Sequence, residues 1–286
     1  MRNNVQHEVL KRASLFLQKN NCEQQVAEIL LRHHLNLSRT EFRLNMRETI
    51  NEDIVTNFEA DIEKHVKSRI PVQHLTGYEY FFGRKFTVNE HVLIPRPETE
   101  ELVAKAIEQI NKRKMSEPLT VVDVGTGSGV IAITLALEVP NLTVYATDIS
   151  GSGLKVAKGN ADILKAKVNF LHGDFLQPLI DSGEKADIVI SNPPYIAFHE
   201  KESLSKTVKN FDPALALFAD KDGLGAYEQI ITQLPKVLKE HGLVLFEIGH
   251  TQGEAVSTLL KHEFPEMKVR VIQDINNLDR IVLGKL

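Results

Sequence analysis

The chain has 286 residues, of which 42% are hydrophobic and 25% are charged, and its formal net charge is −4. That is enough sequence for one large globular domain or two modest ones. The acidic balance argues against a protein that grips nucleic acid through a broad basic surface, and the single cysteine excludes a disulfide framework or a multi-cysteine zinc site.

Residues 1–72 carry helical signals only. Apolar residues recur there at helical spacing, as in Ile54, Phe58, Ile62 and Val66. Ser38-Arg39-Thr40-Glu41 has the form of a capping box, which predicts a helix that starts at Arg39, and Asn51 is a plausible N-cap for the next helix. We therefore expect a small helical bundle, which we assign to docking of a substrate.

Metal, membrane and secretion signals are weak. His33 and His34 are neighbours, and neighbours on a helix point about 100° apart, so they do not indicate a metal site and we expect none. The start of the chain is polar without a signal-peptide core, and no run approaches the roughly 18 apolar residues of a membrane span. We expect a cytoplasmic protein with no membrane partner.

Residues 73–90 change character and form a predicted connector. Aromatic residues gather there: Tyr78, Tyr80, Phe81, Phe82 and Phe86. Two β-prone runs flank Gly83 and Arg84, which predicts a β-hairpin. Its aromatic side chains either cover the end of the second domain's core or wall the active site, and the sequence leaves both open.

Residues 91–286 form the predicted catalytic domain, in which strands and helices alternate from residue 119 onward. Strands are predicted at 119–124, 142–147, 167–171, 186–191, 242–248, 267–272 and 279–284, and helices at 129–138, 151–164, 224–240 and 251–262. Such alternation is typical of a doubly wound parallel α/β sheet. The short link between the last two strands favours an antiparallel pair at the sheet edge.

The first strand-to-helix turn is rich in glycine and reads Gly125, Thr126, Gly127, Ser128 and Gly129. Alternate glycines let the backbone approach a ligand closely. The spacing is not that of a dinucleotide turn, and the lysine of a P-loop is missing. Asp123 in the preceding strand would repel a pyrophosphate but could hold an ammonium group. This pattern favours S-adenosylmethionine as the ligand.

The next two strand ends carry acids. Asp148 closes the second strand about 20 residues after the glycines, where a carboxylate accepts hydrogen bonds from ribose hydroxyls. Asp174 and Phe175 follow the third strand, and they could read an adenine amino group and stack on its ring. A solvated loop acid and a core phenylalanine would give the same two residues.

The fourth strand ends in Asn192-Pro193-Pro194-Tyr195. The two prolines offer carbonyl oxygens but no N–H group, so the turn suits a planar group that brings its own N–H donors. By itself this could be an ordinary strand end stopped by proline. Because ligands of open α/β sheets bind outside the carboxyl ends of the strands, four such ends together indicate a binding site.

These residues resemble class I S-adenosylmethionine-dependent methyltransferases, and Asn-Pro-Pro-Tyr resembles the signature of those that methylate adenine N6, guanine N2 or glutamine amides. Four further segments resemble the HemK/PrmC family of protein-(glutamine-N5) methyltransferases: 71–82, 93–100, 222–224 and 246–252. The chain departs from the expected pattern at Asn276-Asn277, where we expect a glycine. The resemblance implies a Rossmann-like α/β fold with a small all-helical N-terminal domain.

The resemblance also implies an activity, which is methylation of the glutamine in the Gly-Gly-Gln motif of class I peptide chain release factors. Asn192 and the Pro193 carbonyl would accept the two amide hydrogens, with Tyr195 packed against the flat amide. Pro194 would complete the substrate site, Asn192 would also border the cofactor, and Arg96, Glu98 and Thr99 would border the site. No general base is evident.

Two other functions remain open on the residues alone. Asn-Pro-Pro-Tyr suits a nucleic-acid base methyltransferase equally well, although the acidic charge and the absence of a basic recognition domain count against a nucleic-acid substrate. A non-catalytic scaffold that binds the cofactor is the other alternative, and the presence of every expected active-site residue counts against it.

Overall fold

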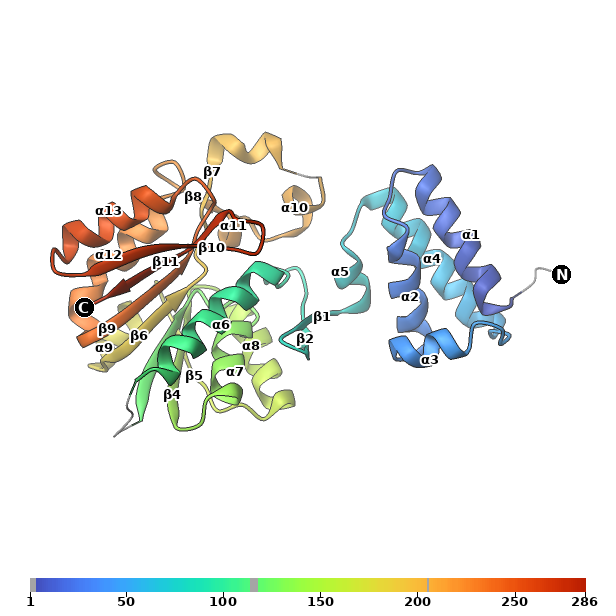
Figure 1. The fold of residues 1–286 in the computed structure, drawn as a ribbon. Coiled ribbons are helices and arrows are strands. Elements are labelled where there is room, and N and C mark those ends of the chain that lie inside the picture. Colours follow the sequence, from blue (N-terminus) through green and yellow to red (C-terminus); the bar gives the residue numbers. More distant parts are fainter. Residues whose placement is uncertain (1–3, 114–117, 205) are drawn as a thin grey trace. The chain divides into compact units, whose positions relative to one another are not determined.

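The computed structural model of the protein describes residues 4–113, 118–204 and 206–286, so the first three residues of the predicted helical domain lie outside it. Over the described residues the chain forms two compact units (Figure 1). One holds residues 4–78 together with the short helix α10 (Lys206–Phe211), and the other holds the rest. Among these residues, no helix is both long and apolar enough to cross a membrane.

The first unit is helical, as predicted. Its main helices are α1 (Gln6–Lys19), α2 (Gln25–Leu35), α3 (Arg39–Leu44), α4 (Glu52–Ser68) and α5 (Val72–Thr76). Ser38 and Glu41 form the capping box of α3, and Asn51 Oδ1 accepts a hydrogen bond from the Asp53 N–H, so both predicted helix starts are confirmed. The helices share one buried core that includes Val9, Leu17, Leu30, Leu31, Phe42, Phe58 and Ile62.

The second unit is built on a sheet. In the described residues its seven strands have the order β10-β11-β9-β6-β3-β4-β5. They are β3 (Leu119–Val124), β4 (Leu142–Asp148), β5 (Asn169–His172), β6 (Ala186–Ser191), β9 (Leu238–Glu247), β10 (Lys268–Gln273) and β11 (Asp279–Lys285). Strand β11 is antiparallel to its neighbours β9 and β10, and the other pairs are parallel. The Rossmann-like sheet and its antiparallel edge pair are confirmed.

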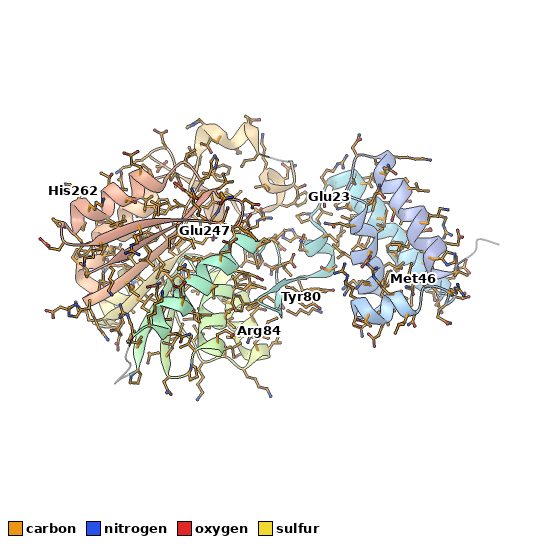
Figure 2. All side chains as sticks on the ribbon, viewed as in Figure 1. Glu23, Met46, Tyr80, Arg84, Glu247 and His262 are labelled. Atoms are coloured by element: carbon orange, nitrogen blue, oxygen red, sulfur yellow. The ribbon has the colours of Figure 1, made fainter. Side chains whose placement is uncertain are left out.

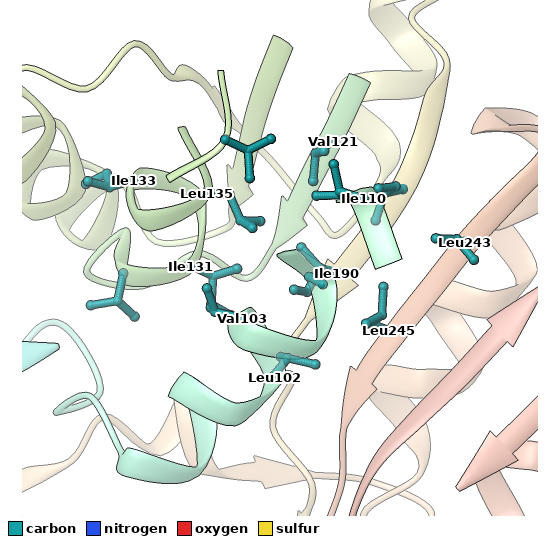
Figure 3. Packing of buried hydrophobic residues seen from close by; sticks show 14 of the residues in the cluster. Leu102, Val103, Ile110, Val121, Ile131, Ile133, Leu135, Ile190, Leu243 and Leu245 are labelled. Carbon is teal, nitrogen blue, oxygen red and sulfur yellow. The ribbon is translucent and has the colours of Figure 1, made fainter. Parts of the chain in front are cut away.

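Helices cover both faces of this sheet. One face packs against α6 (Pro97–Asn111), α7 (Val130–Glu138) and α8 (Gly151–Leu164), and the other against α9 (Gln177–Ser182), α12 (Gly225–Val237) and α13 (Gly253–Glu263). Along β3, Val121 joins the first core and Val122 the second, as the two-residue period of a strand requires. Figure 3 shows the first core, with Leu102 and Ile131 facing strand residues such as Ile190.

The predicted hairpin is present as β1 (Tyr78–Phe81) and β2 (Arg84–Thr87). Phe81 and Phe86 are fully buried in the first core, with their rings edge to face at a centroid distance of 6.1 Å. Of the two roles that the sequence left open for the aromatic residues, these two side chains therefore have the first, because they cover the end of the core.

Two stretches differ from the sequence-based expectation. Helix α12 ends at Val237 rather than at residue 240, and β9 begins at once, because Pro235 has no N–H for the last helical turn and Leu238 pairs with Ala186 of β6. The segment after Tyr195 also carries short elements that no periodicity indicated: β7 (Ile196–Ala197), the 3₁₀ helix η1 (Phe198–Ser203), α11 (Ala214–Leu217) and β8 (Phe218–Ala219).

Candidate functional site

The register of the sheet brings the predicted motifs to one edge. Val124 at the end of β3 pairs with Thr147 of β4 and with Ser191 of β6, and Ser191 pairs with Phe246 of β9. The residues that come next along each strand share this edge: Gly125, Asp148, Asn192 and Glu247. The order of the strands reverses between β3 and β6, which is where open α/β sheets form a ligand-binding crevice.

A cavity of about 490 Å³ lies at this edge, within the second unit. Most of the predicted cofactor-binding residues line it: Gly125, Thr126, Gly127, Ser128, Asp148, Asp174, Phe175 and Asn192. Arg96, Thr99 and Pro194 also line it, whereas Glu98, Gly129, Pro193 and Tyr195 are not among its lining residues. The structure therefore places most of the predicted site residues around one cavity, and a few of them do not line it.

The glycine turn is held by hydrogen bonds to its neighbours. The N–H groups of Gly125 and Thr126 both donate to the Thr147 carbonyl, at 2.9 and 3.0 Å. Asp148 accepts from the Gly127 N–H through Oδ2 and from the Ser150 N–H through Oδ1, each at 2.8 Å. Asp148 thereby fixes the turn while it lines the cavity, and a carboxylate oxygen can accept more than one hydrogen bond.

Gly129 supports the fold rather than lining the cavity. It caps α7 with φ +85°, and a Cβ atom there would lie 2.8 Å from Ile133 Cδ1 and 3.1 Å from Ala157 Cβ. Glycine alone fits both the backbone conformation and the close approach of α8.

Asp123 lies fully buried in contact with the glycine turn. Its Oδ2 accepts hydrogen bonds from the Thr126 hydroxyl at 2.6 Å and the Ala132 N–H at 3.1 Å, whereas Oδ1 has no partner in the described residues. Burial raises the pKa of Asp123 to about 7, and the negative charge of Asp148 adds to this shift. A buried carboxylate with an unpaired oxygen favours a cation nearby, so the site fits a ligand that carries an ammonium group.

Asp174 and Phe175 follow β5, and both line the cavity. Consecutive residues of an extended chain point to opposite sides, but Phe175 has φ +44°, in the left-handed region that few aromatic residues adopt. The backbone therefore turns sharply at Phe175, directly after Asp174, and both residues lie at the cavity.

Asn160 on α8 is a supporting residue that the sequence did not reveal. Its side-chain nitrogen donates to the carbonyls of Thr87 and Ser128, at 3.0 and 2.9 Å, and its oxygen accepts from the Thr87 N–H at 2.8 Å. It therefore ties β2 to the glycine turn. The available signal was a polar residue between Ala157 and Ala161 on the buried face of a helix.

Asn192 is linked to two buried residues from other elements. Its Nδ2 donates to Thr99 Oγ1 at 3.1 Å, and the Thr99 hydroxyl donates to Glu247 Oε2 at 2.8 Å. Figure 2 labels Glu247, which closes β9. Burial raises the pKa of Glu247 to about 7. The sequence analysis did not assign Glu247 to the site, although an acid that closes an apolar strand, as Asp148 does, was an available signal.

Tyr195 lies in the core beside the cavity. Its ring packs against the cluster that contains Tyr227 and Phe246, and burial raises its pKa to about 12. Its carbonyl accepts a hydrogen bond from Gln252 Nε2 at 3.0 Å. Pro193 is also buried. In the structure Tyr195 therefore anchors the turn, and Asn192 and Pro194 are the residues of the turn that line the cavity.

The outer part of the cavity combines an ion pair with exposed apolar side chains. Arg96 donates to the buried Asp212 at 2.7 Å, which ties the loop before α6 to the segment that follows α10. Phe198 and Leu215 line the cavity with more than half of their surface exposed. The part of the chain that the structure describes contains no cluster of His, Cys, Asp or Glu side chains that could hold a metal ion.

Comparison with known proteins adds the following. Residues 8–77 match the family described as PrmC N-terminal domain, and residues 103–212 match Methyltransferase small domain. The chain is 48% identical to a release factor glutamine methyltransferase of Bacillus cereus, over 98% of this chain and 99% of that protein. It is 45% identical to the corresponding protein of Bacillus subtilis, over 96% of each. A methyltransferase structure from Pyrococcus furiosus, 14% identical, covers 80% of this chain and 98% of its own with a TM-score of 0.52, which shows a shared fold.

Proposed function

The chain belongs to the release factor glutamine methyltransferase family, and on that premise we propose its reaction. A methyl group passes from S-adenosyl-L-methionine to the side-chain amide N5 of the glutamine in the Gly-Gly-Gln motif of class I peptide chain release factors, in the cytoplasm. The observation that carries the proposal is the position of Asn192, which lines the same cavity as the glycine turn and is held there by Thr99.

The residues around the glycine turn suit this cofactor, which supplies a methyl group on a positively charged sulfur. Asp123 does not itself line the cavity, but it is buried against the glycine turn and keeps one unpaired oxygen, whose charge would attract the ammonium group. Asp148 faces the cavity at the end of β4, where a carboxylate accepts from ribose hydroxyls, and Asp174 and Phe175 suit the amino group and the flat face of adenine. No phosphate has to be accommodated, which agrees with a buried acid beside the turn.

The chain's task in the reaction is to orient a weak nucleophile. The nitrogen of a carboxamide reacts poorly because its lone pair is delocalised into the carbonyl group. Asn192 Oδ1 would accept one amide hydrogen. The Pro193 carbonyl, which we predict to accept the other, belongs to a buried residue outside the cavity lining, so Asn192 has the main part in orienting the amide. Positioning and electrostatics then supply most of the rate. The nitrogen exchanges one of its two hydrogens for the methyl group, and that proton would pass to water, since we assign no side chain as its acceptor.

The test is a labelling assay with S-adenosylmethionine that carries a labelled methyl group. The protein is incubated separately with a release factor, with the same factor whose Gly-Gly-Gln glutamine is replaced by alanine, with DNA and with RNA. We expect label on the intact release factor alone. Label on DNA or RNA, or on the factor without its glutamine, would refute the proposed substrate.

The Asn192→Ala variant is the matched loss-of-function control. It should abolish methyl transfer while the dissociation constant for the cofactor stays close to that of the parent protein. Near-full turnover by this variant would remove Asn192 from the proposed role.

A further inference from the structure

The hydrogen bonds that link Asn192, Thr99 and Glu247 have a direction that follows from their chemistry. A carboxylate can only accept hydrogen bonds, so the Thr99 hydroxyl has to donate its hydrogen to Glu247 in this hydrogen bond. The Thr99 oxygen can then only accept, and the Asn192 atom that lies 3.1 Å from it has to be the NH₂ nitrogen. The carboxylate therefore settles which way round the Asn192 amide lies.

We propose that Glu247 and Thr99 form a brace that holds the Asn192 carboxamide with its nitrogen toward the protein and its oxygen toward the substrate. The inference rests on the proposed function and deepens it. An oxygen at this position accepts the hydrogen of the substrate amide, whereas an NH₂ group would place donor against donor and exclude the reactive geometry. Glu247 does not line the cavity, and Thr99, which does, acts in this role through Asn192, so both are positioning residues.

The brace is built from rigid parts. Thr99 and Glu247 are 3% and 2% exposed, respectively, and they come from the first turn of α6 and the last residue of β9. The Thr99 N–H donates to the Arg96 carbonyl at 3.1 Å, and the Tyr227 hydroxyl donates to the Glu247 carbonyl at 2.8 Å. Residues of α6 and β9, which are distant in the sequence, thus converge on the Asn192 side-chain amide.

Protonation of Glu247 would remove the fixed order of donors and acceptors in the brace. A neutral carboxyl group can donate to Thr99, which frees the Thr99 hydroxyl to donate to the Asn192 oxygen and lets the amide turn over. Burial raises the pKa of Glu247 to about 7, and Glu98 on α6 acts in the same direction. Arg280 on β11 and the hydrogen bond from Thr99 act against this shift, and so does the Asn192 amide, which also directs its NH₂ group toward this carboxylate. Tyr195 and Tyr227 also face this carboxylate, and both stay neutral near pH 7 because burial raises each pKa.

The first test measures kcat at saturating release factor and cofactor between pH 5.5 and 8.5. The brace predicts that kcat of the parent protein rises with pH along a limb centred near 7, where Glu247 loses its proton. In Glu247→Gln the limb should disappear, because a glutamine amide both donates and accepts at every pH. Thr99→Val should lower kcat roughly tenfold to a hundredfold, and Thr99→Ser should recover most of that loss.

The second test reads the amide directly, without any substrate. In ¹⁵N spectra of the full chain, the side-chain NH₂ signals of Asn192 are assigned by their loss in Asn192→Asp. They should titrate with a midpoint near pH 7 in the parent protein and cease to titrate in Glu247→Gln. The dissociation constant for the cofactor should stay close to the parent value in Glu247→Gln and in Thr99→Val, whereas a purely structural role would change it.

The outcomes distinguish failure of the proposed brace from failure of the proposed methyltransferase function. Signals that do not titrate, or a Thr99→Val variant with the parent kcat, overturn the brace. If the parent protein labels no release factor, the proposed function fails, and the spectra still decide the brace on their own. If Glu247→Gln does not fold, the contrast between Thr99→Val and Thr99→Ser, together with the titration of the parent protein, decides instead.

Discussion

Buried polar side chains below the strand ends set the chemistry of this site at the scale of single residues. Asp123 and Glu247 are both acids that burial holds near a pKa of about 7, and each lies behind a residue that lines the cavity. Asp123 keeps an unpaired oxygen, whereas Glu247 has Thr99 as a donor. The first is therefore suited to bind a cation and the second to position a neighbour.

Asp123→Asn should weaken binding of S-adenosylmethionine about tenfold, since a charged hydrogen bond to an ammonium group contributes roughly 1.5–3 kcal/mol and part of it remains with a neutral oxygen. The deprotonated acid is the form that attracts the ammonium group, and its pKa is raised to about 7. Affinity of the parent protein should therefore fall as the pH drops from 8 to 6, and the variant should lose this dependence.

Titration calorimetry at several pH values measures both effects. The matched control is Asp181→Asn, because Asp181 is exposed on α9 and accepts from Gln177 of the same helix, whereas Asp123 is buried and accepts from Thr126 of the glycine turn. An affinity of Asp123→Asn equal to that of the control at every pH would contradict the assignment of Asp123 to the ammonium group.

At the scale of elements, the Asn192 turn is held in place by segments that follow much later in the chain. Gln252, which precedes α13, holds the Tyr195 carbonyl. Gly223, which precedes α12, has φ +84°, and a Cβ atom there would lie 2.2 Å from that same carbonyl oxygen. The residues just before two helices thus contact the backbone of the Asn192 turn, and the conformation of the turn depends on both contacts.

Gly223→Ala should displace the turn and lower kcat at least tenfold, while the strain costs roughly 1–3 kcal/mol of unfolding free energy. Chemical denaturation and steady-state kinetics measure the two effects. Gly159→Ala is the control, because Gly159 lies within α8 with ordinary helical φ and open space at the Cβ position. That change should leave kcat alone and raise stability by up to about 1 kcal/mol. Equal kinetics for both variants would show that the contact with Tyr195 does not shape the turn.

At the scale of the whole molecule, the described residues divide into a helical unit and a catalytic unit, and the described cavity belongs to the catalytic unit. The helical unit includes residues 8–77, which match the PrmC N-terminal domain, and it has its own buried core. The predicted limits at residues 72 and 91 and the docking role of the helical bundle remain proposals.

Deletion of residues 1–70 should raise KM for the release factor far more than the dissociation constant for the cofactor, because the cavity-lining residues all lie beyond the deletion. Steady-state kinetics and calorimetry on the shortened and full-length proteins give the two numbers. A similar loss in both, or a collapsed melting transition, would point to misfolding rather than to lost docking.

Much of the fold could be predicted from local patterns in the sequence. The strand positions followed from runs such as Val121-Val122 and Ile188-Val189-Ile190, in which consecutive residues face different cores. The turn motifs were equally legible, because glycines and prolines act through their own backbone geometry. The short elements after Tyr195 could not be predicted, since two-residue strands and single turns have no period to detect.

The sequence by itself determined which residue types stand at each strand end, and these residue types are the basis of the cofactor and the kind of nitrogen that we propose for the site. Only the tertiary structure decided which of them touch. Thr99 is separated by 93 residues from Asn192 and by 148 from Glu247, and Asn160 by 73 from Thr87. Sheet register and helix packing bring these pairs into contact, and both depend on the summed burial of the two cores rather than on any local signal.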